Sequence, residues 1–92
     1  MSISFTKHAK VRRQQRAVPR LVINWLLQFG SVEHDKHGAE IHFFNKESRK
    51  ALASEVGSQI VSRVADLLDA YLVINGNQVV TVGYRFKHIN RT

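Results

Sequence analysis

The strongest structural signal in this chain is the stretch AYLVINGNQVVTVGYRFK, residues 70–87. Two runs rich in β-branched and aromatic residues, 70–74 and 79–86, flank Asn75-Gly76-Asn77, a pattern typical of a β-hairpin. Side chains alternate between the two faces of a strand. One face of the hairpin is then expected to carry Tyr71, Val73, Val80, Val82, Tyr84 and Phe86, and the other Leu72, Ile74, Val79, Thr81, Arg85 and Lys87.

Two helices are predicted in the N-terminal third of the chain. The hydroxyl of Thr6 is suited to cap a first helix that runs to about Arg16. Pro19 suits the first turn of a second helix, and Gly30 suits its end. Apolar residues recur in this second helix at helical spacing: Leu21, Val22, Trp25, Leu26 and Phe29. We expect it to be buried on most of its circumference, which excludes the polar recognition helix of a helix-turn-helix protein.

The central part of the chain combines a loop, a strand and helices. Residues 31–38 read as a polar loop, and residues 39–44 as a strand with Ile41 and Phe43 on one face. Asn45 can cap a third helix over 46–56 that Gly57 ends. Apolar residues between 60 and 68 again recur at helical spacing. The 92 residues form one domain. The order predicts an α+β fold in which N-terminal helices pack on a small curved antiparallel sheet that ends in the hairpin.

Composition narrows the possible environments and partners. The chain has no cysteine, so disulfides and thiolate metal sites are excluded. Its longest apolar runs are too short to span a bilayer, so we expect no membrane partner and a cytoplasmic location. Lys and Arg number 14 against 7 Asp and Glu, a net charge of +7. Such an excess favours polyanionic partners, either a nucleic acid or an acidic protein.

The basic residues are concentrated in the first helix. Residues 7–20 contain no Asp or Glu. His8, Arg12 and Arg16 are four residues apart and therefore form one ridge along that helix, beside Lys7. Arg offers a planar set of donors that matches phosphate, and His can exchange a proton near neutral pH. The simpler interpretation is a solvated basic face.

A second basic cluster closes the predicted hairpin. Tyr84, Arg85, Phe86 and Lys87 alternate aromatic and basic side chains. Basic patches beside aromatic rings hold phosphates and unstacked bases. Thr81, Arg85 and Lys87 are expected on one face as a small polar cluster. The simpler interpretation is a strand with its aromatic side chains in the core and its cations in water.

Metal chemistry finds little support in the sequence. His34, His37 and His42 fall in or near the predicted polar loop, without the helical spacing of a zinc protease. Carboxylates are few and scattered, and Asp66 and Asp69 are expected to cap or pair near a helix end. The sequence therefore predicts neither a metal site nor a cofactor.

Three segments carry a family resemblance. Residues 6–16, TKHAKVRRQQR, resemble the H-x-x-x-R-x-x-x-R start of a family of small bacterial proteins known as a domain of unknown function. The similarity continues through DAYLVI, residues 69–74, and VTVGYRFK, residues 80–87. Ala17 stands where that family often has Gly. The family in turn resembles the barnase–RelE-like ribonucleases, which pack N-terminal helices on a curved antiparallel sheet and often act as toxins of toxin–antitoxin pairs.

This resemblance implies a metal-independent endoribonuclease in which the 2′-hydroxyl of RNA attacks the adjacent phosphorus. It assigns His8 as general base or acid, Arg12 and Arg85 as cations at the phosphorane, and Tyr84 as a proton donor or stacking residue. The remaining candidate RNA-binding residues are Lys7, Arg16, Thr81 and Lys87. The expected partners are RNA and an antitoxin protein with an acidic surface.

Two alternatives use the same basic surface without this chemistry. One is a non-catalytic RNA-binding or ribosome-associated module, and the other is a protein-interaction domain that docks an acidic partner. Within the enzyme hypothesis one conflict remains. Tyr84 and Arg85 alternate across the strand, so both reach one site only if the strand ends or twists there.

Overall fold

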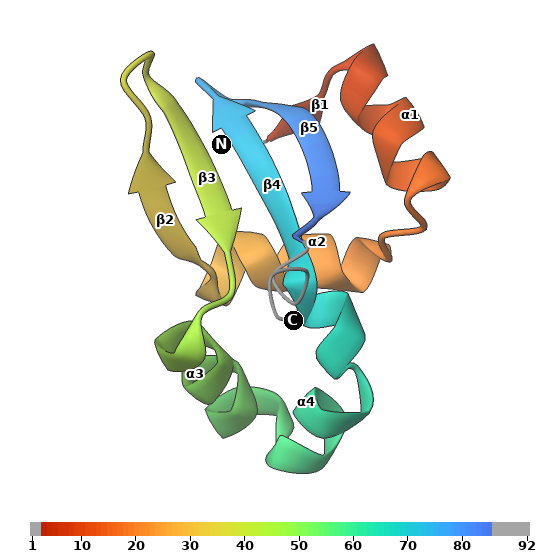
Figure 1. Cartoon of the computed structure of the whole chain (residues 1–92), viewed down its shortest axis with the longest axis vertical. Coiled ribbons are helices and arrows are strands. Elements are labelled where there is room, and N and C mark those ends of the chain that lie inside the picture. The colour runs from red at the N-terminus through yellow and green to blue at the C-terminus, as the bar shows by residue number, and fades with distance from the viewer. Residues whose placement is uncertain (1–2, 86–92) are drawn as a thin grey trace, which may run out of the picture.

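The computed structural model describes residues 3–85, which form an α+β domain around a five-stranded sheet (Figure 1). The N-terminal elements are β1 (Ser4–Phe5), α1 (Lys7–Gln15), α2 (Arg20–Phe29) and β2 (Ser31–His34). The central and C-terminal ones are β3 (Ala39–Phe43), α3 (Lys46–Val56), α4 (Ser58–Arg63), the 3-10 helix η1 (Ala65–Asp69), β4 (Ala70–Asn75) and β5 (Gln78–Tyr84). The predicted α+β class is confirmed.

The sheet is mixed, so the prediction of a purely antiparallel sheet was wrong. Its strand order is β1-β5-β4-β3-β2, and every pairing is antiparallel except that of β1 with β5. The amides of Ser4 and Thr6 donate to the carbonyls of Asn77 and Val79, each at 3.0 Å. A two-residue strand is too short to show an alternating pattern, which is why β1 could not be predicted from the sequence.

The predicted loop over 31–38 was also wrong in its first half, because β2 pairs with β3 over four residues. The carboxylate of Asp35 closes the turn between them by accepting the amides of His37 at 2.8 Å and Ala39 at 2.9 Å. The hydrogen bonds from Ala39 and His37 hold the pKa of Asp35 below its ordinary value. β2 is an edge strand whose side chains are mostly exposed, so its polar side chains stay in water. It therefore lacks the alternation of apolar and polar residues by which a strand is recognised in a sequence.

Capping residues fix the helix starts as predicted. The hydroxyl of Thr6 accepts the amide of Ala9 at 3.1 Å and begins α1. Asn45 and Ser48 form a reciprocal capping box at the start of α3, and Gly57 ends that helix. The predicted helical repeat between 60 and 68 is instead divided between α4 and η1.

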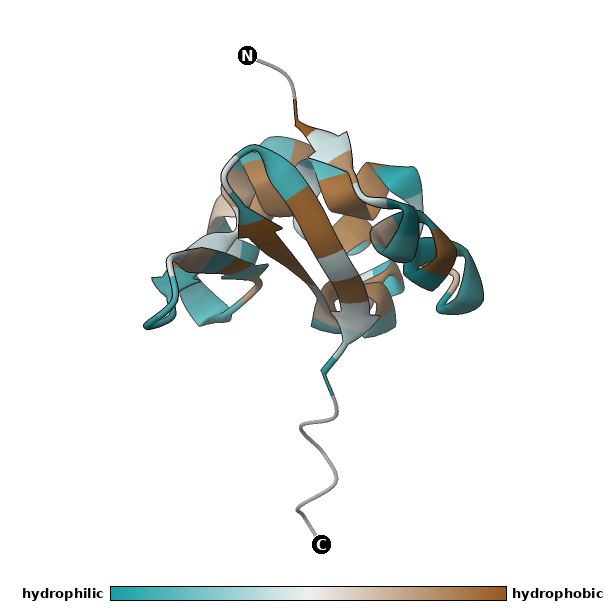
Figure 2. Ribbon diagram, turned by 90° about the horizontal axis from the view of Figure 1, so that it is seen from above, coloured by the Kyte–Doolittle hydropathy of each residue, from teal (hydrophilic) through white to brown (hydrophobic). Residues whose placement is uncertain are grey.

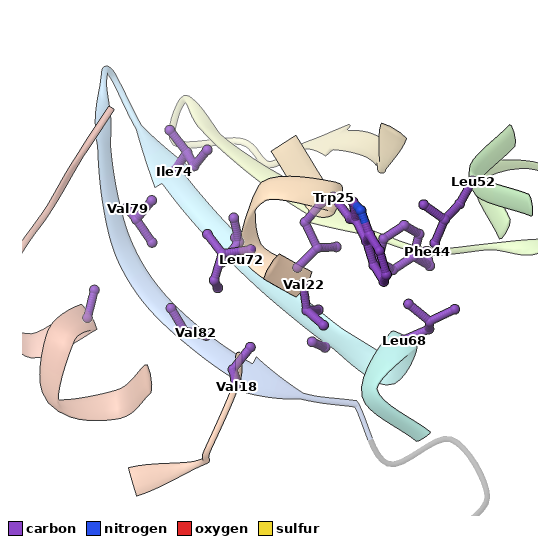
Figure 3. Close-up of a cluster of buried hydrophobic side chains, with 14 residues drawn as sticks. Val18, Val22, Trp25, Phe44, Leu52, Leu68, Leu72, Ile74, Val79 and Val82 are labelled. Carbon is purple, nitrogen blue, oxygen red and sulfur yellow. The ribbon is translucent and has the colours of Figure 1, made fainter. Parts of the chain in front are cut away.

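The core lies between α2 and one face of the sheet. α2 crosses behind the sheet in the view of Figure 1 and presents Val22, Ile23, Trp25 and Leu26 to it. Leu72, Ile74, Val79 and Val82 of the hairpin meet these side chains (Figure 3). Leu21, predicted on the apolar stripe of α2, is 55% exposed and does not belong to this core. The face of the sheet turned away from α2 is called the open face below.

A β-bulge at Val80 changes the faces predicted for β5. Val73 pairs with Thr81 but Ile74 pairs with Val79, so Val80 is an extra residue on β5. Directly paired residues share a face. Thr81 and Gly83 therefore lie on the open face, whereas Val82 and Tyr84 lie on the α2 face. The predicted grouping of Tyr84 with Tyr71, and of Thr81 with Leu72, was wrong for this reason.

Ala17, just after α1, has a φ of 54°, in the left-handed region. A residue with a Cβ atom is destabilised by about 1–2 kcal/mol in this region, whereas Gly is not. Gly loses about 0.5–1 kcal/mol more in backbone entropy on folding, which offsets part of this difference. Ala17→Gly is therefore expected to raise the free energy of unfolding by about 0.5–1 kcal/mol, measured by urea denaturation. The control Ala51→Gly, on the exposed side of α3, should lower it by about 1 kcal/mol. A loss of stability in both variants would contradict this explanation.

Candidate nucleic-acid interface

α1 lies along β5 and flanks the open face on one side, while the β2–β3 hairpin flanks it on the other (Figure 2). At one end of β5, the amide of Thr6, just before α1, donates a hydrogen bond to the carbonyl of Val79. At the other end the Tyr84 hydroxyl donates to the carbonyl of Ala17 at 3.3 Å. Ala9 is completely buried and fixes the rotation of α1. Arg12 and Arg16, three and seven residues further on, are thereby placed beside the open face.

A cavity of about 200 Å³ lies where α1 meets the open face. It is lined by Arg12, Arg16, Tyr71, Thr81, Val82, Gly83 and Tyr84. We call it the open-face cavity. It brings together two arginines, a threonine and two tyrosines. The fold therefore brings four of the predicted site residues together: Arg12, Arg16, Thr81 and Tyr84.

Tyr71 is a member of this cavity that the sequence reasoning did not select. Tyr71 pairs directly with Gly83 across the hairpin. A Cβ atom built at Gly83 would stand 3.0 Å from both Cε1 and Oη of Tyr71, so the phenol ring lies over the glycine. The absence of a side chain at Gly83 lets the ring cross β5 toward α1. An aromatic residue opposite a glycine in neighbouring strands is the signal that could have found it.

Gly83→Ala tests this placement, because the added methyl group must push the Tyr71 ring away from β5. If the open face binds single-stranded RNA, its affinity for RNA should fall by about 10-fold in this variant, since base–aromatic stacking contributes about 1–3 kcal/mol per base. Tyr71→Ala should produce a similar loss, and the double variant little more than either alone. An undiminished affinity in Gly83→Ala, with the fold retained by circular dichroism, would remove the Tyr71 ring from the interface.

Tyr84 lies at the edge of the cavity, on the α2 face of the sheet. It packs against the core, and its hydroxyl is held by the Ala17 carbonyl. Burial raises the pKa of Tyr84 above its ordinary value of 10.0, so the phenol stays protonated at neutral pH. Its fixed hydroxyl joins the end of β5 to the turn after α1.

Arg85 lies elsewhere on the open face. Its guanidinium carbon stands 4.6 Å from the centroid of the Phe43 ring, a cation–π contact on β3. Its amide donates to the carbonyl of Asp69 at 2.8 Å. Arg85 does not line the open-face cavity. Lys87, predicted to share the site, falls outside the described residues.

His8 and Lys7 also lie apart from the cavity. Both are exposed side chains in the first turn of α1. A helix rises about 1.5 Å per residue, so His8 lies about 12 Å along the axis from Arg16. His8 remains on the ridge with Arg12 and Arg16, but it does not line the cavity.

The charge of the chain is strongly divided along the sequence. Every Asp and Glu lies between residues 33 and 69, so α1, α2 and the described part of the hairpin contain none. Among residues 3–85, no carboxylate lies within ion-pair distance of Arg12 or Arg16. Arg49 does pair there, at 3.1 Å from Asp69, so of the two roles expected for Asp69, capping or pairing, the structure shows pairing. The open-face cavity is therefore cationic without internal compensation.

The histidine cluster lies at the other end of the sheet. Nε2 of His42 stands 3.2 Å from one oxygen of Glu40, and Nε2 of His34 stands 3.4 Å from the other. The hydrogen bond from His42 holds the pKa of Glu40 below its ordinary value. Within residues 3–85, no group of three or more His, Cys, Asp or Glu side chains is arranged to hold a metal ion.

Comparison with known proteins identifies no relative. No protein-family model matches the chain, and neither the characterised proteins nor the solved structures contain a match. In the described part of the chain, no helix is both long enough and apolar enough to cross a membrane.

Proposed function

We propose that this chain binds single-stranded RNA on its open face and cleaves it without a metal ion. The observation that carries the proposal is the open-face cavity, where Arg12, Arg16 and Tyr71 meet in a region free of carboxylates. Guanidinium groups match the phosphodiester, and an aromatic ring accepts an unstacked base. Such a ring favours a single strand, because the bases of a duplex are already stacked.

The proposed reaction is transesterification. The 2′-hydroxyl loses its proton to a base and attacks the adjacent phosphorus, and the 5′-oxygen leaves with a proton from an acid. The products are a 2′,3′-cyclic phosphate and a 5′-hydroxyl. Arg12 and Arg16 would stabilise the charge on the phosphorane, and His8 would act as the base. The α+β order of elements is compatible with a barnase–RelE-like fold, which supports the same chemistry.

A specific observation favours a second candidate, a module that binds RNA without cleaving it. His8, the residue suited to proton transfer near neutral pH, does not line the cavity. The two functions share the same interface and differ only in the presence of a base beside it.

One experiment separates these functions. Purified protein is incubated with single-stranded RNA in excess EDTA, and the product ends are identified by mass spectrometry. The ribonuclease proposal predicts cyclic phosphate ends despite the chelator. Binding without cleavage would assign the chain to the second function, and cleavage that EDTA abolishes would overturn the metal-independent mechanism.

We further propose that this chain is a toxin that acts on cytoplasmic RNA and that a protein with an acidic surface neutralises it. The cationic open face and the family resemblance support this role. Expression of the unpartnered chain in a bacterium is then expected to slow growth, and Arg85→Ala is expected to relieve that effect. The exposed contact of Arg85 with Phe43 contributes about 0.5–1 kcal/mol, so the variant should still fold. Arg63→Ala, an exposed arginine on α4, is the matched control. Full toxicity of a folded Arg85→Ala protein would exclude Arg85 from the function.

A further inference from the structure

A second and larger cavity lies on the other side of α1, between α1 and α2, with β1 at one end. Its volume is about 410 Å³, roughly twice that of the open-face cavity. Small-molecule sites typically have volumes of about 300–1,000 Å³. We call it the interhelical cavity. Neither the predicted site residues nor the proposed reaction uses it.

Three cations line this cavity: Lys10, Arg13 and Arg20. None of the three has a carboxylate within ion-pair distance among residues 3–85, and all acidic residues of the chain lie beyond residue 32. Arg13 is oriented by a hydrogen bond from its Nη1 to the carbonyl of Val18, at 3.5 Å. The charge around the cavity is therefore available to an anionic ligand.

The floor of the cavity is apolar. Ile23 is almost completely buried, and Phe5 and Leu27 are partly buried against the core. Gln14 and Asn24 are exposed at its sides, and each amide offers both donors and acceptors. An apolar floor, side-chain amides and cations together match the three parts of a nucleotide: the faces of the base, its polar edges and its phosphate.

We infer that the interhelical cavity binds a nucleotide, resting on the proposed RNA-binding function of the open face. α1 separates the two cavities and is only about 10 Å wide, so an RNA strand of a few nucleotides can pass over it. The helix contains no acidic residue, and its exposed surface is basic or polar over most of its length. The phosphate chemistry is the same for a free mononucleotide and for a nucleotide within a strand.

The test removes the three charges by Lys10→Gln, Arg13→Gln and Arg20→Gln together. The control variant removes three exposed charges elsewhere on the molecule, by Lys36→Gln, Lys46→Gln and Lys50→Gln, on the β2–β3 turn and α3. The probe is a 12-nucleotide 2′-O-methyl RNA, which cannot be cleaved. We expect the cavity variant to lose at least ~10-fold in affinity. The slope of log affinity against log salt should decrease in magnitude by about 2, since each of the three lost phosphate contacts contributes about 0.7. The control variant should change neither quantity.

A second measurement needs no variant. Backbone amide NMR shifts of the unmodified protein are followed during titration with adenosine 5′-monophosphate, with a 2′-O-methyl dinucleotide and with the 12-mer. Shifts around Asn24 and Leu27 with the mononucleotide indicate a site for free nucleotides, whereas shifts with the 12-mer alone indicate a site for the strand. Shifts there with a polyglutamate peptide and none with nucleotides would overturn the inference in favour of an acidic polypeptide.

The failure of this inference can be distinguished from that of the proposed function. Arg12→Gln with Arg16→Gln tests the open-face cavity alone. If that variant loses the 12-mer while the Lys10, Arg13 and Arg20 variant keeps both its affinity and its salt slope, the open-face proposal stands and the interhelical inference is wrong. If neither variant weakens binding, both proposals are wrong.

Discussion

Replacing His8 by glutamine is expected to lower the rate of RNA cleavage by about 10²–10⁴-fold and to leave RNA affinity nearly unchanged. Glutamine retains a polar side chain of similar reach but cannot accept a proton from the 2′-hydroxyl. His8 is exposed on the ridge of α1 that leads to Arg12 and Arg16, so a strand held by those arginines can reach it. The measurement is single-turnover cleavage in EDTA beside equilibrium binding of uncleavable RNA.

The matched control is His37→Gln, an exposed histidine on the turn between β2 and β3. It removes an imidazole far from α1 and should leave both quantities unchanged. A His8→Gln protein with near-normal cleavage would show that His8 is only a polar residue on a solvated helix. The tyrosines of the open-face cavity would then be the groups to test as proton donors. His8 is nevertheless the first residue to test, because catalytic contacts often tighten only in the complex.

Local hydrogen-bonding signals account for the parts of the fold that the sequence predicted well. Thr6 and Asn45 cap α1 and α3 because their side-chain oxygens accept amides that a helix start leaves unpaired. The turn of the hairpin forms at Gly76, whose φ of 66° suits a glycine. These preferences act over a few residues, so they can be recognised without knowledge of the rest of the fold.

The features that were missed depend on contacts with distant parts of the chain. β1 and β2 are stabilised by their pairing with β5 and β3, not by an alternating pattern of their own. The bulge at Val80 lies in the sequence VVTV, where β-branched residues fit either face equally well. A shift by one residue exchanges the faces of a strand. Residues beyond Val80 were therefore placed on the wrong faces.

The bulge also explains which part of the site could be predicted. Arg12 and Arg16 follow from helical spacing, which no sheet register affects. Thr81 was selected as a polar residue in an apolar strand, although on the wrong face. Tyr71 was missed because an aromatic residue in a β-rich run is usually a core residue. Its partner Gly83 becomes informative only when the register of the hairpin is known.

Arg12→Ala is expected to reduce both cleavage and RNA affinity, in contrast to His8→Gln. Loss of one preorganised donor at a developing oxyanion lowers kcat by about 10²–10³-fold. In the proposed complex Arg12 also holds a phosphate in the ground state, so affinity should fall as well, and the salt slope of binding should decrease by about 0.7. The measurements are single-turnover cleavage and binding of uncleavable RNA over a range of salt concentrations.

Arg12→Lys and Arg63→Ala make this prediction specific. Lysine keeps the positive charge but not the planar set of donors, so Arg12→Lys should retain the salt slope and still lose most of the cleavage rate. Arg63→Ala removes an exposed arginine from α4 and should change neither quantity. If Arg12→Ala weakened binding and cleavage by the same factor, and Arg12→Lys restored both, Arg12 would act only as a charge that attracts RNA. We expect Arg12→Ala to reduce cleavage more than binding, and Arg12→Lys not to restore the cleavage rate. This is the result for a group that contacts the phosphorane, because such a group stabilises the transition state more strongly than the bound strand.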